Sequence, residues 1–115
     1  DNPKIINKLM EARKGREDVW RTILKSDINL TVGTDSMHGY MYYEIEKLID
    51  FGATPEEAIK MSTIDSARCV RMEDKIGSIE EGKYADFVIL KEDPLKNIHT
   101  IQEPSSVFKG GKKVN

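Results

Sequence analysis

The feature of this 115-residue chain that most restricts its fold is one short strand pattern set among helical patterns. Residues 30–34 read Leu-Thr-Val-Gly-Thr, a partly β-branched segment that is too short for a helix and is bounded by polar residues. Apolar side chains at helical spacing precede it in residues 1–26 and return after residue 40. A single strand followed by helices cannot cover its own edges. This half of the chain is therefore predicted to be one β/α unit of a larger α/β fold.

Local signals predict where the helices begin and end. Gly15 separates two apolar stripes, which predicts either two helices or one kinked helix in the first 26 residues. A second helical pattern covers residues 45–49 and should stop at Gly52. The order Thr-Pro-Glu-Glu at residues 54–57 is typical of an N-cap, a first-turn proline and a capping-box glutamate. A further short helical piece is expected at residues 65–71.

The remaining residues have β character. Residues 76–79 and 86–90 are predicted strands, and the second is apolar on both faces, so it should be buried from both sides. Gly110-Gly111 predicts a two-residue hairpin between two short flanking strands. The predicted domains are the end of an α/β region, residues 1–72, and a small β region, residues 73–115.

Composition excludes several classes of partner. Eighteen Lys and Arg stand against 20 Asp and Glu, a net charge of −2 that points to neither nucleic acid nor an anionic membrane. The longest apolar run, residues 87–90, is far too short to span a bilayer. The lone Cys69 favours a reducing, cytoplasmic compartment, and its apolar helical setting predicts a small buried core residue. Because residue 1 is Asp and not Met, we expect the chain to be part of a longer one.

Asp35 is the leading candidate for chemistry. It directly follows the predicted strand 30–34, and the carboxyl ends of strands carry the catalytic residues of α/β barrels. A carboxylate there can bind a metal ion and accept a proton, although a loop or helix cap explains an aspartate there equally well. His38 lies three residues further on, where it is either a second metal ligand or substrate contact or an ordinary loop histidine. No role is assigned to His99, which falls in a predicted turn.

Several motifs together resemble the C-terminal portion of the metal-dependent amidohydrolase superfamily, and most closely its imidazolonepropionase-like and Xaa-Pro dipeptidase-like branch. The resemblance covers residues 29 to 115 in order. The matching segments are Gly33-Thr34-Asp35, His38-Gly39, Thr54–Ala58, Met61–Thr63, Ser66–Arg68, Ile76–Leu90, Asp93–Leu95 and Val107–Gly111.

The resemblance implies a fold and a metal site. The fold would be α/β: the last β/α unit of a TIM-like (β/α)8 barrel in residues 1–72, then C-terminal strands of a small composite β-sandwich in residues 73–115. Family members hold one or two divalent metals, usually zinc, and the aspartate after the eighth strand corresponds to Asp35. Its implied role is metal ligand and general base, which takes a proton from the metal-activated water and passes it to the leaving amine. The implied substrate is a small molecule with a hydrolysable C–N bond.

The chain departs from the family pattern in what it lacks. Its sequence has only two histidines and no His-x-His motif, which supplies metal ligands from the family's first barrel strand. We therefore expect the chain alone to be inactive and to bind no zinc tightly, and we expect its partner to be the missing N-terminal part of the barrel. The alternative is a non-catalytic structural or interaction module that buries its open edges in a homo-oligomer.

Overall fold

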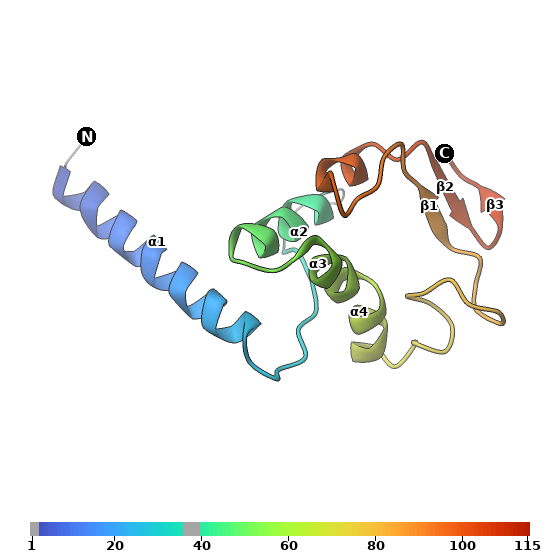
Figure 1. Cartoon of the computed structure of the whole chain (residues 1–115), viewed down its shortest axis with the longest axis horizontal. Coiled ribbons are helices and arrows are strands. Elements are labelled where there is room, and N and C mark those ends of the chain that lie inside the picture. The colour runs from blue at the N-terminus through green and yellow to red at the C-terminus, as the bar shows by residue number, and fades with distance from the viewer. Residues whose placement is uncertain (1–2, 36–39) are drawn as a thin grey trace.

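The computed structural model describes residues 3–35 and 40–115 as a group of helices followed by a small antiparallel sheet (Figure 1). In chain order the elements are α1 (Pro3–Leu24), α2 (Met41–Asp50), α3 (Pro55–Ser62), α4 (Ile64–Cys69), β1 (Phe87–Ile89), the 3-10 helix η1 (Ile98–Gln102), β2 (Ser106–Lys109) and β3 (Lys112–Lys113). Helices α2, α3 and α4 pack in succession, η1 lies against α2, and α1 extends away from this group (Figure 1).

The first helix is continuous from Pro3 to Leu24, so of the two alternatives predicted at Gly15 the one with two separate helices is wrong. A glycine inside a helix costs about 1 kcal/mol relative to alanine but leaves the hydrogen-bonding pattern intact. The Arg13–Glu17 pair, 3.3 Å from Nε to Oε1, bridges the glycine on one side of α1. The helix has no buried residue, and its ring contact with the rest of the chain joins Trp20 to Phe51, with parallel rings 5.9 Å apart.

The predicted end of α2 at Gly52 and the predicted capping box at the start of α3 are both confirmed. Gly52 follows α2 with a φ of +113°, a conformation that glycine adopts without a Cβ penalty. At the start of α3, the Thr54 hydroxyl accepts a hydrogen bond from the Glu57 N–H (3.2 Å), and the Glu57 carboxylate accepts one from the Thr54 N–H (2.7 Å). These hydrogen bonds hold the pKa of Glu57 below its ordinary value.

A small apolar core joins the helices to η1. Its buried members are Ile45, Ala53 and Ala58. Partly buried side chains from the end of α1, from α2 and from η1 surround them: Leu24, Leu48, Ile49, Ile98 and Ile101. The core therefore connects the helical half of the chain to its β half.

The sheet has the order β1-β2-β3, and both strand pairs are antiparallel. Phe87 faces Phe108 in the β1–β2 register, with ring centroids 4.6 Å apart. The predicted hairpin at Gly110-Gly111 is confirmed, since both glycines have positive φ between β2 and β3. The Asp86 carboxylate accepts hydrogen bonds from the Gly110 N–H (2.7 Å) and from the Lys109 ammonium, which ties β1 to the hairpin.

Two predicted strands are not strands among the residues described. Residues 30–34 lie between α1 and α2 without ladder pairing, and residues 76–78 form bends followed by irregular backbone at residue 79. Strands need partners, and neither segment finds one within the described part of this chain. Gly77 in the second segment instead lies against α4, where an added Cβ would meet the Cβ of Ala67 at 2.8 Å.

Two burial predictions are also wrong. The segment 87–90 is not buried from both sides, because Val88 and Ile89 remain 52% and 47% exposed. Cys69 is exposed rather than part of the core. Helix α4 has six residues, and Ala67 occupies its inward position.

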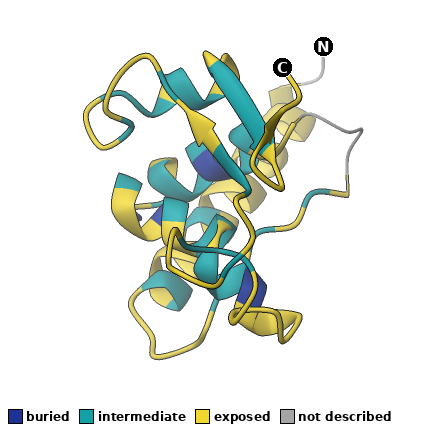
Figure 2. Ribbon diagram, turned by 90° about the vertical axis from the view of Figure 1, so that its right-hand side faces the viewer, coloured by how far each residue is buried: buried dark blue, intermediate teal, exposed yellow. Residues whose placement is uncertain are grey.

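The chain exposes more surface than a closed domain of its size. Its accessible surface is 9075 Å², against about 6,400 Å² expected for a folded monomer of this mass. The radius of gyration is 16.9 Å, whereas a compact chain of this length would have about 13 Å. Buried positions form only short stretches of the ribbon (Figure 2), and along α1 nearly every residue is exposed. Within the described residues, no helix combines the length and apolarity needed to cross a membrane.

Candidate functional site

Asp35 stands at the end of an extended segment whose burial alternates. Along residues 30–35, half-buried and exposed side chains follow each other with a period of two. The half-buried positions are Leu30, Val32 and Thr34, and the exposed ones are Thr31, Gly33 and Asp35. This is the periodicity of a strand with one covered face. Asp35 is therefore on the exposed side of this segment.

Residues on α1 and α2 lie against this segment. Trp20, Leu48 and Phe51 line, together with residues 30–33, a hollow of about 270 Å³. Leu30 and Val32, which are half-buried, line this hollow, whereas Asp35 remains exposed. The helices therefore position Asp35 through its chain neighbours.

A carboxylate in this position suits one ligand of a zinc or similar divalent ion. A complete site needs three or four donors, and among the described residues no three His, Cys, Asp or Glu side chains cluster closely enough to hold a metal. The second predicted ligand or substrate contact, His38, lies outside the described residues. The described residues therefore do not by themselves form a metal site around Asp35.

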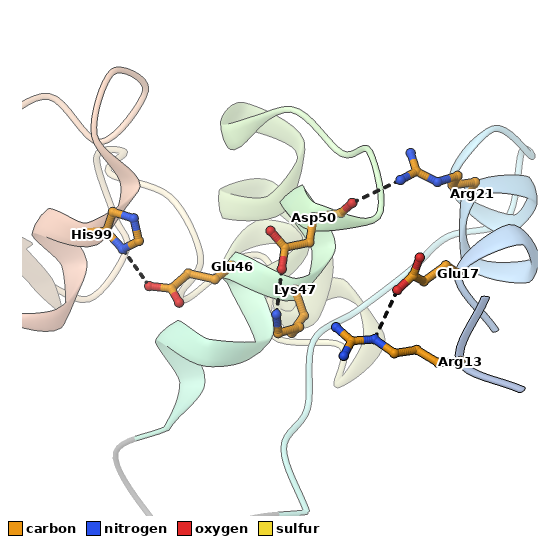
Figure 3. Close-up of polar contacts among 7 residues, drawn as sticks. All are labelled: Arg13, Glu17, Arg21, Glu46, Lys47, Asp50 and His99. Carbon is orange, nitrogen blue, oxygen red and sulfur yellow. Dashed lines mark hydrogen bonds and ion pairs between the residues drawn. The ribbon is translucent and has the colours of Figure 1, made fainter. Parts of the chain in front are cut away.

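A polar cluster that is not predictable from the sequence links the helices to η1 (Figure 3). Glu46 on α2 lies 2.9 Å, through Oε1, from Nδ1 of His99, and accepts a hydrogen bond from the Gln102 side chain at 2.6 Å. These residues are more than 50 positions apart in sequence, so only the folded chain brings them together. His99, for which no role is predicted from the sequence, therefore helps to dock η1 on α2.

On the same helix, Lys47 bonds to Asp50 through Nζ and Oδ2 at 2.6 Å (Figure 3). The Asp50 carboxylate raises the pKa of Lys47 above its ordinary value. Arg21 of α1 donates to the main-chain oxygen of Asp50 at 3.4 Å. These contacts hold α1 beside the end of α2.

Comparison with known proteins gives one family. The profile described as "Amidohydrolase family" matches residues 2–114. An adenine deaminase from Desulforamulus reducens is 37% identical over 93 residues, which cover 75% of this chain and 15% of the deaminase. An ochratoxinase from Aspergillus niger is 31% identical over 114 residues, which cover 91% of this chain and 23% of the ochratoxinase.

Solved structures agree with the sequence matches. A crystal structure of a Xaa-Pro dipeptidase superposes with a TM-score of 0.81 at 30% identity, covering 86% of this chain and 25% of the dipeptidase. The crystal structure of the A. niger ochratoxinase gives a TM-score of 0.81 at 30% identity, covering 93% of this chain and 26% of that one. The chain thus spans about a quarter or less of the length of these relatives.

Proposed function

Because the chain belongs to the amidohydrolase family, we propose that it supplies the C-terminal part of a metal-dependent hydrolase acting on a C–N bond of a small molecule. One observation carries the proposal: the chain exposes about 2,700 Å² more surface than a closed domain of its mass. Its relatives superpose on it closely and are about three and a half times as long. The remainder of such a relative would cover the open faces.

In this proposal residues 1–72 end a (β/α)8 barrel, and residues 73–115 contribute strands to a composite β-sandwich. The alternating burial of residues 30–35 supports the barrel assignment. A strand of such a barrel turns one face to its helices and the other to the barrel interior. Leu30 and Val32 face α1 and α2, so Asp35 would lie on the interior side, at the carboxyl end of the eighth strand.

Asp35 would act there as metal ligand and general base. A divalent ion, zinc in the family's usual case, would activate water and polarise the scissile group. Asp35 would take a proton from the attacking water and deliver it to the leaving amine, as a carboxylate within hydrogen-bond reach of both can do. His38, three residues beyond, would contact the substrate.

The relatives' names set the range of substrates, since they include an adenine deaminase, an ochratoxinase and a Xaa-Pro dipeptidase. Each name is compatible with cleavage of a C–N bond, and we propose a substrate of the same chemical class. A reducing, cytoplasmic setting is proposed because the exposed Cys69 would remain a free thiol there.

A chimera tests this function. Residues 29–115 would replace the matching C-terminal region of the Xaa-Pro dipeptidase, and hydrolysis of an Xaa-Pro dipeptide and bound zinc would be measured. We expect an active chimera in which Asp35→Asn lowers kcat by about 1000-fold or more. Asp74→Asn, at an exposed aspartate far along the chain, is the matched control and should leave kcat unchanged. An unchanged kcat in the Asp35→Asn chimera would contradict the role of Asp35.

The isolated chain distinguishes this function from the alternative of a free-standing interaction module. The proposed function predicts no hydrolysis with added zinc and polydisperse association in sedimentation velocity. A monodisperse, concentration-independent dimer would instead support a module that covers its own open edges.

A further inference from the structure

A second groove, of about 580 Å³, runs between α1 and α2. Its α1 wall consists of Arg13, Arg16, Glu17 and Trp20, whose spacing of three, four and seven residues puts them on one helix face. Its α2 wall consists of residues that recur at similar spacing: Tyr43, Lys47, Asp50 and Phe51. In Figure 3, Arg13 and Glu17 of the α1 wall lie opposite Lys47 and Asp50 of the α2 wall.

Three aromatic rings give the groove flat apolar surfaces. Trp20 and Phe51 stack across the junction of the two helices with an angle of 3° between their planes. Tyr43 lies about two helical turns before Phe51. The Lys47 ammonium is 5.3 Å from the centroid of the Tyr43 ring. Such surfaces favour a planar apolar group, which can stack with an offset or edge-to-face geometry.

Four of the five charged side chains that line the groove form ion pairs with each other. Arg13 pairs with Glu17 at 3.3 Å, and Lys47 pairs with Asp50 at 2.6 Å. Arg16 lines the groove and has no hydrogen bond or ion pair with any described residue. An arginine fork of this kind binds a carboxylate through two parallel N–H···O bonds.

We propose that this groove binds a small aromatic carboxylate, with the ring against Trp20 and Tyr43 and the carboxylate on Arg16. Its volume lies within the range of about 300–1,000 Å³ that is usual for small-molecule sites. The inference does not rest on the chemistry assigned to Asp35, because none of the lining residues takes part in that chemistry.

The chain carries its own probe, since Trp20 is its single tryptophan and lines the groove. Its indole N–H gives one cross-peak in a proton–nitrogen correlation spectrum of the 115-residue chain. Titration with 2-naphthoate, at a chain concentration where sedimentation shows a monomer, should move this peak saturably. The uncharged 2-naphthamide should bind about tenfold more weakly, because it cannot form the charged pair with Arg16. Acetate, which lacks the ring, should produce no saturable shift.

Two variants assign the effect to the groove. Arg16→Gln should weaken binding of 2-naphthoate about tenfold, while leaving the affinity for 2-naphthamide unchanged. Lys14→Gln removes the same charge from α1 two residues away, at a position outside the groove, and should bind like the unmodified chain. The proposal is overturned if the indole peak does not shift saturably, if both naphthalene probes bind equally, or if both variants weaken binding alike.

Discussion

At the scale of single residues, the side chains of Thr54 and Glu57 exchange the hydrogen bonds that begin α3. Replacing Thr54 with alanine removes the hydroxyl that accepts the Glu57 N–H at the start of α3. We expect Thr54→Ala to lower the free energy of unfolding by about 1 kcal/mol, the usual cost of losing an N-cap. Urea unfolding followed by circular dichroism measures this. Thr31→Ala, at an exposed threonine outside the helices, should cost much less, and an equal loss in both variants would contradict the capping role.

The contacts of the Asp86 carboxylate predict that the free energy of unfolding depends on pH. The Lys109 ammonium and the Gly110 N–H hold the pKa of Asp86 below its ordinary value of 3.8. A carboxyl whose pKa is lower in the folded than in the unfolded chain stabilises the fold above the ordinary value and loses this contribution as the pH falls through the lowered one. Asp86→Asn should therefore unfold at lower urea concentration than the unmodified chain at pH 7, and the difference should vanish in acid. Asp74→Asn, the control, should show no such convergence.

At the scale of elements, the sequence predicts those structures that depend on interactions between residues close together in the chain. The capping box of α3 and the Gly110-Gly111 hairpin depend on residues a few positions apart, and both were readable from the sequence. The strand predicted at residues 30–34 depends on neighbours in space, and the described part of the chain contains none for it. The groove wall on α1 has a readable spacing, but no sequence signal says that it faces α2. The contact of Glu46 with His99 could not be predicted from the sequence for the same reason.

The contact between the loop at Gly77 and α4 gives a prediction at this scale. An added Cβ at Gly77 would lie 2.8 Å from the Cβ of Ala67 and 2.9 Å from the Cα of Ile64. Gly82 has nearly the same φ, +90° against +93°, and nothing within 4 Å of its Cβ position. Gly82→Ala thus costs only backbone strain, about 1 kcal/mol, whereas Gly77→Ala should cost about 2–4 kcal/mol because it also separates the loop from α4. Equal losses in urea unfolding would show that this contact contributes nothing.

At the scale of the whole molecule, the open surface predicts a weak response to denaturant. An unfolded chain of this mass exposes about 19,000 Å², so folding to 9075 Å² buries about four-fifths of what a compact domain of the same length would bury. The slope of unfolding free energy against urea is proportional to the surface that unfolding exposes. We therefore expect a slope about one-fifth below that of a compact 115-residue domain, measured at a concentration where sedimentation shows a monomer. A full-sized slope for a monomer would mean that α1 packs onto the other helices in solution, which would remove both the groove and the exposed surface on which the proposed function rests.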